Sequence, residues 1–345
     1  MSDTQQSIQE VKTSTSDPNV IPVGKLYEVR PDGRWNIYID HHMISGFAKC
    51  ESYFELAHIQ RVKPRGMSFT ANIGIWWAKS LEWYYTALAQ GSLTREVAVH
   101  LALDAWDECS IDKLVPNFPY SYEKFGGREG AIVMISQYFD FAYQYDSVHW
   151  KVIGVEAGFG RKRECLIGEN DKVCVYYIGK PDIFIREDKY LMPVDNKTKD
   201  YIKADIEHQF KPHAQTAGYI VAAQEICKHL GIHEVIDRCL VNVAARNEPS
   251  DNPRGGKARK PRFKRVPVHY SVAELQEWRD QKVIQAARLR ECIETNTWIW
   301  NDSACHYYGG CEYRAIHAAP PAARLVVINA SYRIAEAWTP YEPED

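Results

Sequence analysis

The chain has 345 residues, of which 45% are hydrophobic and 25% charged, and its formal net charge is −3. This composition is typical of an ordinary globular protein. It contains no run of about eighteen apolar residues, so no membrane span is expected. Because the charge is close to neutral, any affinity for nucleic acid must come from local patches.

The N-terminal residues are rich in Ser, Thr, Gln and Asp and have no apolar core, which is typical neither of a signal peptide nor of a regular element. We predict a disordered tail over residues 1–35 and a cytoplasmic protein. The nine cysteines are an odd number scattered over the chain, so we expect them to be mostly reduced.

The next part of the chain is predicted to be mainly helical. Apolar and aromatic residues recur at helical spacing over residues 44–61, with Ser45 as the candidate N-cap, and again over residues 73–90. Residues 90–147 are predicted to form a helical cap over a sheet. Cys50 lies in the first helix, where a small core residue is its ordinary interpretation.

Strands are predicted at residues 150–159 and 173–178, followed by a hairpin formed by residues 179–185 and 190–198. We expect these four strands to form one antiparallel-rich sheet. Pro193 cannot donate to a ladder, so its strand should be an edge there or locally bulged.

The hairpin places Asp182 at the start of one strand and Asp195 at the end of the next, so the two carboxylates should lie side by side. Lys197 leaves the strand on the same face as Asp195. A divalent cation relieves the repulsion between two such acids, which predicts Mg²⁺ or Mn²⁺. Lys197 then holds or helps to deprotonate a water, or neutralises a phosphate. Glu156 either faces solvent or reaches the same site.

The bare pattern of an acid, any residue and a lysine is weak evidence, because it occurs four times in the chain. A surface ion pair on a hairpin rim is the alternative.

After the hairpin, Pro212 and Gly231 bracket a predicted helix in which Gln215 and Tyr219 share a face. Residues 235–245 are predicted to return to the sheet as a strand. Residues 250–266 are predicted to form a flexible basic loop that contacts phosphates, with a merely solvated loop as the alternative. Its seven cationic residues are Arg254, Lys257, Arg259, Lys260, Arg262, Lys264 and Arg265.

A further helix is predicted over residues 271–295, and Cys305, Cys311 and His317 follow it at regular spacing. Thiolate-rich sites of this kind bind iron–sulfur clusters or zinc. Residues 319–345 are expected to be a tail without chemistry.

The ordered set Gly179-x-x-Asp182, Asp195-x-Lys197-Thr198 and Gln215-x-x-x-Tyr219 resembles the motifs of the PD-(D/E)XK nuclease superfamily. The most similar branch contains the RecB and AddB nuclease domains, the CRISPR-adaptation exonucleases and their phage relatives. The resemblance covers roughly residues 45–317. It implies a single nuclease domain over residues 36–318 with a restriction-endonuclease-like core at about 148–246. The implied α/β fold is a central mixed, antiparallel-rich β-sheet flanked by helices, with a helical insertion.

The resemblance also implies roles for individual residues. Asp182 and Asp195 would hold Mg²⁺ or Mn²⁺ with Glu82 as a third ligand, although an exposed helix glutamate is the alternative for Glu82. The helix pair Gln215 and Tyr219 would contact DNA or orient the site. Where these nucleases carry a histidine four residues before the helix acid, this chain has an alanine, Ala78, which puts a two-metal mechanism in doubt.

Nucleases of the AddB kind close their fold with a [4Fe-4S] cluster held by one early and three late cysteines. Cys50, Cys305 and Cys311 match three of these positions, and His317 stands at the fourth. Asp302 and Cys292 are alternative fourth ligands. Zinc or an empty site are alternatives to the cluster.

The expected activity is therefore metal-dependent hydrolysis of DNA, by an exonuclease acting on single strands or ends in recombination, repair or phage DNA processing. DNA and a recombination or replication protein are the expected partners, in the cytoplasm of a bacterial or phage-infected cell. The alternative is a catalytically weak DNA-binding or recombination-partner module with a structural metal site.

Overall fold

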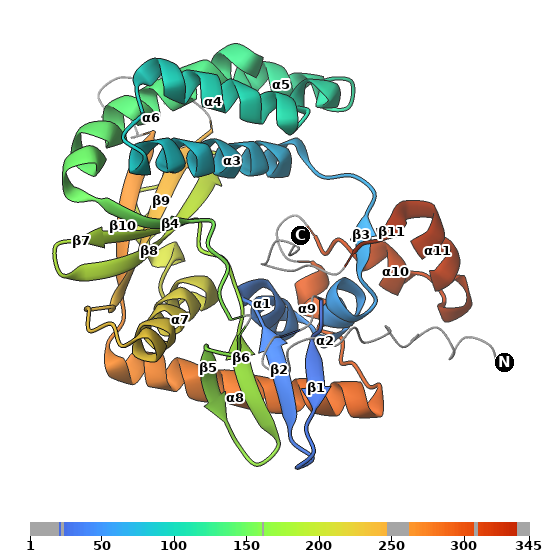
Figure 1. Cartoon of the computed structure of the whole chain (residues 1–345). Coiled ribbons are helices and arrows are strands. Elements are labelled where there is room, and N and C mark those ends of the chain that lie inside the picture. The colour runs from blue at the N-terminus through green and yellow to red at the C-terminus, as the bar shows by residue number, and fades with distance from the viewer. Residues whose placement is uncertain (1–20, 22–23, 161, 247–261, 307–309, 337–345) are drawn as a thin grey trace.

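The computed structural model describes residues 21, 24–160, 162–246, 262–306 and 310–336. Helices flank a five-stranded and a four-stranded sheet, both of mixed direction, which confirms the predicted α/β class (Figure 1). Within these ranges, no helix is both long enough and apolar enough to cross a membrane.

The five-stranded sheet has the order β10-β9-β8-β7-β4, and only its β8–β9 pair is parallel. The predicted hairpin is present, because β7 and β8 pair from Ile183 opposite Val194 to Glu187 opposite Tyr190. The strands are β4 (Lys151–Val155), β7 (Ile183–Glu187), β8 (Tyr190–Lys199), β9 (Arg238–Ala245) and β10 (Phe263–His269).

Pro193 lies in the central strand β8, between β7 and β9, so the expectation of an edge strand is wrong. The parallel ladder with β9 begins only at Val194, so the missing N–H of Pro193 falls just before this ladder starts.

The four-stranded sheet has the order β1-β2-β6-β5. It corrects two expectations. First, residues 173–178 pair in parallel with β2 and not with the β7–β8 hairpin. Second, the predicted N-terminal tail contains a hairpin of its own, formed by β1 and β2, whose turn has the typical turn residues Asp32 and Gly33. The strands are β1 (Tyr27–Val29), β2 (Trp35–Ile39), β5 (Leu166–Glu169) and β6 (Val173–Tyr177).

A helical layer covers one face of the five-stranded sheet, as predicted (Figure 1). Large aromatic side chains, among them Trp76, Trp77 and Trp106, are buried between these helices and the strands. Burying such rings contributes strongly to stability. The helices are α3 (Phe69–Ala89), α4 (Arg95–Glu108), α5 (Pro119–Phe125) and α6 (Gly127–His149), with a 3₁₀ turn at Ile111–Leu114.

Two helices line the second hydrophobic core. The helix α7 (Ala214–Leu230) packs on β8 and β9, and α8 (Val272–Thr295) packs on β5 and β6 (Figure 1). Gly218 permits close packing of α7, because a Cβ there would lie 2.3 Å from the ring of Tyr177.

The predicted early helix is broken at Cys50. It comprises α1 (His41–Lys49), α2 (Glu51–Phe54) and a π turn (Glu55–Ile59). Its N-cap is Asp40, whose carboxylate accepts from the Met43 N–H, and not Ser45.

The C-terminal segment is structured as far as residue 336, so the expected tail is wrong for residues 319–336. Its last strand, β11, pairs with β3 and returns the chain to the early helices. The elements are β3 (Val62–Pro64), α9 (Asp302–Cys305), α10 (Arg314–Ala318), a 3₁₀ turn (Pro321–Ala323), α11 (Arg324–Ser331) and β11 (Tyr332–Ile334).

The basic loop is shorter than expected. Its first four cations, Arg254, Lys257, Arg259 and Lys260, lie outside the described residues. The other three lie in or beside β10: Arg262 is buried and donates to Gln137, Lys264 pairs with Glu207, and Arg265 pairs with Asp146.

The Arg265–Asp146 pair is buried between β10 and α6. Asp146 is fully buried, and its Oδ2 accepts from Arg265 Nη2 at 2.7 Å and from the Tyr85 hydroxyl at 2.9 Å. The Arg265 guanidinium also lies 4.2 Å from the Trp150 ring centre. This cation therefore has a structural role, in contrast to the phosphate contact that its place in a basic run predicted.

We expect Arg265→Met to lower the free energy of unfolding by about 3–5 kcal/mol, because it leaves the Asp146 carboxyl buried without its cation. Lys264→Met is the matched control on the same strand, and its loss should stay below about 1 kcal/mol because the Lys264–Glu207 pair is more exposed. Urea unfolding measures both. Equal losses would contradict a structural role for Arg265.

Candidate active site

The hairpin brings the two predicted acids together. Asp182 immediately precedes β7, and Asp195 lies in β8 next to Val194, the residue opposite Ile183. The backbone N–H of Asn196 donates to Asp182 Oδ2, so the side chain of one strand is fixed to the backbone of the other. Asp195 is only 2% exposed. The two carboxyl groups therefore share one poorly solvated volume.

Burial and the nearby charge of Asp195 raise the pKa of Asp182 to about 8; Glu156 adds to this effect and Lys197 opposes it. At neutral pH, without an added cation, the Asp182 carboxyl therefore remains largely protonated. This is the electrostatic conflict that the sequence predicted.

Asp195 has a protein cation beside it. Lys197 Nζ lies 3.0 Å from Asp195 Oδ1 and 2.9 Å from Oδ2. Burial alone would lower the pKa of Lys197, but the carboxyl groups of Asp195 and Asp182 outweigh it and raise this pKa. The Lys197 ammonium therefore contacts both oxygens of the buried Asp195 carboxylate.

The helix α7 orients the Asp195 carboxylate through hydrogen bonds. Gln215 Nε2 donates to Asp195 Oδ1 at 2.8 Å and to the Tyr219 hydroxyl at 3.2 Å, and that hydroxyl donates to the Lys180 carbonyl at 3.0 Å. Both side chains are buried. Of the two roles that the resemblance implied, burial therefore favours orienting the site over contacting DNA.

Gly179 allows Phe159 to approach the backbone just before this site. A Cβ at this position would lie 2.8 Å from the ring of Phe159, so a larger residue would push the segment before Asp182 away.

Glu156 is the third acid of the cluster. It has a left-handed backbone conformation with φ of 51°, its N–H donates to the Asp182 carbonyl, and its carboxylate pairs with Lys180 Nζ at 2.8 Å. A non-glycine residue with this φ is uncommon and costs free energy, which marks the turn as strained. Of its two predicted placements, Glu156 takes the one toward the site.

The predicted third ligand, Glu82 of α3, lies near Glu156, whereas Glu156 is the acid near Asp182. Burial raises the pKa of Glu156, and the charge of Glu82 adds to that effect; Glu82 itself is 3.8 Å from Lys79 Nζ. The structure thus brings Glu156, rather than Glu82, next to Asp182. Ala78, one turn before Glu82, offers no side chain that binds a metal.

Two histidines that sequence reasoning missed, His41 and His42, lie near Lys197. Burial lowers the pKa of His41 and of His42, and the positive charge of Lys197 lowers both further. Their rings are 3.9 Å apart, and His41 contacts the ring of Tyr219 at 6.0 Å. The available signal was the run Asp40-His41-His42 directly after the apolar strand β2.

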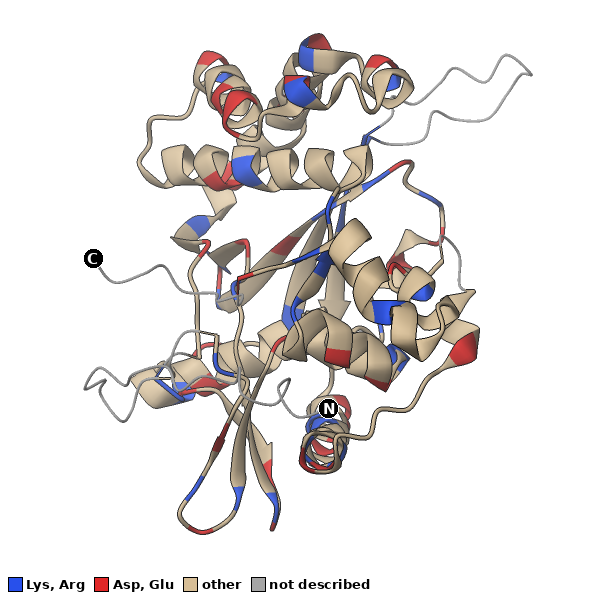
Figure 2. Ribbon diagram, turned by 90° about the vertical axis from the view of Figure 1, so that its right-hand side faces the viewer, with Lys and Arg blue, Asp and Glu red and all other residues tan. Residues whose placement is uncertain are grey.

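Cationic residues continue from Lys197 along the end of β8. Burial lowers the pKa of Lys199, and the charges of Lys197 and Arg246 lower it further. Arg246 also donates to the Thr198 hydroxyl at 3.2 Å. Elsewhere acidic and basic residues are interspersed along the sheets and helices (Figure 2). The group of cations formed by Lys197, Lys199 and Arg246 is therefore a local feature beside the acids.

The early and late cysteines also come together. Asn301 N–H donates to Cys50 Sγ at 3.5 Å, and the Cys311 N–H donates to the Cys305 carbonyl. Burial raises the pKa of the Cys311 thiol, and the charges of Cys305 and Cys50 raise it further. All nine cysteines, each within the described ranges, are free.

The candidates for a fourth ligand have other partners. His317 stacks on Trp300 at 4.7 Å, and Cys292 Sγ donates to Glu51 at 3.4 Å. Asp302 accepts from the Ser303 N–H. Three thiols without a fourth ligand do not complete a [4Fe-4S] or zinc site among the described residues.

In the part of the chain that the structure describes, no group of three or more His, Cys, Asp or Glu side chains is placed to hold a metal ion. The acid pair nevertheless fits one. The Lys197 ammonium is bound to Asp195, whereas burial and the neighbouring acids keep Asp182 from ionising. A divalent cation between the two carboxylates would supply positive charge to Asp182 through oxygen ligands alone.

Comparison of the chain with known protein families and with curated proteins found no match. The nuclease resemblance therefore depends on the ordered motifs and on the contacts described above.

In the metal-free protein, Asp182 should make stability depend on pH. The native state holds the Asp182 proton up to about pH 8, whereas the unfolded state releases it near the ordinary value of 3.8. The native state thus binds more protons between these values, and stability falls as pH rises through this window.

We expect the difference in unfolding free energy between wild type and Asp182→Asn to fall by up to about 1.4 kcal/mol per pH unit from pH 5 to 8, and to level off above. Urea unfolding in EDTA measures it. Parallel pH profiles for the two proteins would show that Asp182 ionises normally.

Proposed function

We propose that this chain is a Mg²⁺- or Mn²⁺-dependent deoxyribonuclease that hydrolyses phosphodiester bonds. Its expected mode is exonucleolytic, on single-stranded DNA or DNA ends, during recombination, repair or phage DNA processing. One observation carries the proposal: Asp182 before β7, Asp195 and Lys197 of β8, and Gln215 of α7 meet in one hydrogen-bonded cluster.

Asp182 and Asp195 would hold the divalent cation, and the nearby Glu156 carboxylate, paired with Lys180, adds negative charge to the site. Such a cation polarises the scissile phosphate and makes a bound water more acidic. Gln215 and Tyr219 keep the Asp195 carboxylate in one orientation through hydrogen bonds of 2.8 and 3.2 Å. Fixing the ligand in advance reduces the reorganisation that binding and reaction require.

Lys197 would hold the attacking water or neutralise charge that develops on the phosphate. Its ammonium is already positioned by Asp195. The cationic Lys199 and Arg246 lie along the same strand end, where they can contact neighbouring phosphates of the DNA. A recombination or replication protein would deliver the substrate.

The activity test uses end-labelled single-stranded, end-labelled double-stranded and circular DNA with Mn²⁺ or Mg²⁺. We expect Asp195→Asn to lower the cleavage rate by at least about 100-fold, since it removes a charge that acts directly on the reacting centre. Asp188→Asn is the matched control, because Asp188 lies in the turn of the same hairpin at its other end.

Cleavage of linear but not circular DNA would identify an exonuclease. Equal rates for wild type and Asp195→Asn, or no cleavage by either together with DNA binding, would instead favour the recombination-partner alternative.

We further propose that Cys50, Cys305 and Cys311 hold a structural metal centre, an iron–sulfur cluster or zinc, that links α1 to the C-terminal segment, and that His317 completes the site by exchanging its stacking on Trp300 for the metal. Anaerobically purified protein should contain iron and sulfide, or zinc, in a fixed ratio to chain. Cys311→Ser should lower that ratio several-fold and destabilise the fold, because metal binding contributes directly to folding. Cys109→Ser, which changes the C-cap of α4, is the control and should bind as much metal as wild type. If Cys311→Ser also contained as much metal as wild type, the centre would be excluded.

A further inference from the structure

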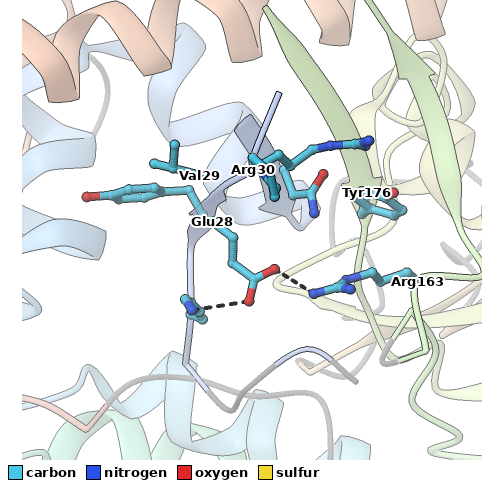
Figure 3. A pocket seen from close by; sticks show the side chains of 9 residues that line it. Glu28, Val29, Arg30, Arg163 and Tyr176 are labelled. Carbon is cyan, nitrogen blue, oxygen red and sulfur yellow. Dashed lines mark hydrogen bonds and ion pairs between the residues drawn. The ribbon is translucent and has the colours of Figure 1, made fainter. Parts of the chain in front are cut away.

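A hollow of about 610 Å³ opens on one face of the four-stranded sheet (Figure 3). Alternate residues of β2 and β6, such as Trp35 and Val175, pack against α8 in the core. Asn36 and Tyr176 therefore point to the opposite face, where they line the hollow. None of the proposed nuclease residues lines it.

Three cations and one acid line the hollow. Glu28 binds two of the cations, with Lys25 Nζ at 3.1 Å and Arg163 Nη2 at 2.5 Å, and accepts from the Tyr38 hydroxyl at 2.6 Å. Figure 3 shows the Glu28 carboxylate facing Arg163. Glu28 thus fixes Lys25 and Arg163 at the wall, and the lining keeps an excess of positive charge.

The third cation, Arg30, comes from the end of β1. It pairs with Asp32 at 3.3 Å and donates to Cys174 Sγ at 3.3 Å, and its side chain is one-third exposed. Asp32 also binds Arg34 at 3.0 Å, and Arg34 pairs in addition with Glu169 at 2.9 Å, so Arg30 shares its exposed carboxylate partner with a second cation. An anion in the hollow can therefore gain a guanidinium contact.

Asn36 carries the independent evidence for a ligand. It is 7% exposed, and its Oδ1 is buried and accepts no hydrogen bond from the described residues. A buried amide oxygen without a donor is costly, and native proteins rarely leave one unsatisfied. The occupant of the hollow should therefore present an N–H or O–H group to this oxygen.

The ligand must also suit an aromatic wall. Tyr176 is half-buried, with its ring 5.7 Å from that of Tyr38. The volume lies within the range of small-molecule sites. A nucleobase supplies both a flat face for stacking and N–H donors, and its phosphate supplies the negative charge.

We propose that this hollow binds a nucleoside phosphate, with the phosphate on Arg30 and Arg163, the base against Tyr176 and a base N–H donating to Asn36 Oδ1. The source is either a free nucleotide or a nucleotide of the DNA strand. The second source rests on the proposed nuclease function; the site itself does not.

The site lies close in sequence to the acid pair, which belongs to the other sheet. Asn36 lies in β2, which ends at Ile39 just before Asp40 and His41, and Asp182 follows Tyr176 of β6 by six positions. At about 3.3 Å per residue, that is no more than about 20 Å, a span of a few nucleotides. A strand nucleotide held here would therefore leave the acid pair free for another phosphate.

The test measures binding of 5′-dAMP, deoxyadenosine and inorganic phosphate to the full chain by calorimetry in EDTA. We expect dAMP to bind at least about tenfold more tightly than either fragment. Arg30→Gln should weaken dAMP binding at least about tenfold through loss of the guanidinium contact. Arg34→Gln is the matched control, because it removes the same charge from the same turn but does not line the hollow; it should bind dAMP like wild type.

Asn36→Leu tests the buried acceptor. It should retain or raise the melting temperature, because the orphaned oxygen is gone, and still weaken dAMP at least about fivefold. Unchanged dAMP affinity would mean that a water satisfies Asn36 and would overturn the site. Absence of dAMP binding at millimolar concentration, or equal losses in Arg30→Gln and Arg34→Gln, would overturn it too.

A labelled single-stranded oligonucleotide separates the two sources. If the hollow takes a strand nucleotide, dAMP competes with the oligonucleotide and Arg30→Gln weakens both. If it takes a free nucleotide, Arg30→Gln weakens dAMP alone. Asp195→Asn should bind dAMP like wild type while losing cleavage, so a failure of the nuclease proposal and a failure of this site are distinguishable.

Discussion

The strand β8 carries buried polar side chains toward both faces of the five-stranded sheet, and the rest of the structure depends on this constraint. Asp195 faces α7 and accepts from Gln215, whereas Asn196 faces the helical layer and accepts from Asn242 Nδ2 at 2.9 Å. Because side chains alternate along a strand, a shift of one residue would exchange these faces. Each buried group would then lose its partner, so the register of β8 is strongly specified.

The two faces are linked to distant elements. The amide of Asn242 also donates to the Tyr138 hydroxyl at 2.5 Å, and that hydroxyl lies 2.6 Å from the Tyr85 hydroxyl, which donates to Asp146. This chain of hydrogen bonds continues to Arg265 on β10. Besides covering the sheet, the helical layer therefore fixes the position of β8, the strand that carries Asp195 and Lys197.

Sequence reasoning succeeded where the determinants were local. Asp182 and Asp195 are joined by a short hairpin whose turn residues and β-branched strands set the register, so their proximity followed from the chain itself. The parallel pairing of β2 with β6 joins residues more than 130 positions apart, and no local pattern specifies such a partner. The fate of Arg265 also depended on a distant residue, since only the fully buried Asp146 distinguishes a structural cation from one that contacts phosphate.

The charges of the site argue for a particular role of Lys197. Within the described residues, Glu82, Glu156 and Asp195 each have a lysine partner, and Asp182 has none. An added cation is therefore needed most at Asp182, where burial and neighbouring acids oppose ionisation. Lys197, in contrast, is kept protonated by the same acids, which raise its pKa. An ammonium group that holds its proton cannot accept one from water, so Lys197 is better suited to orient the attacking water or to neutralise the phosphate than to act as the general base.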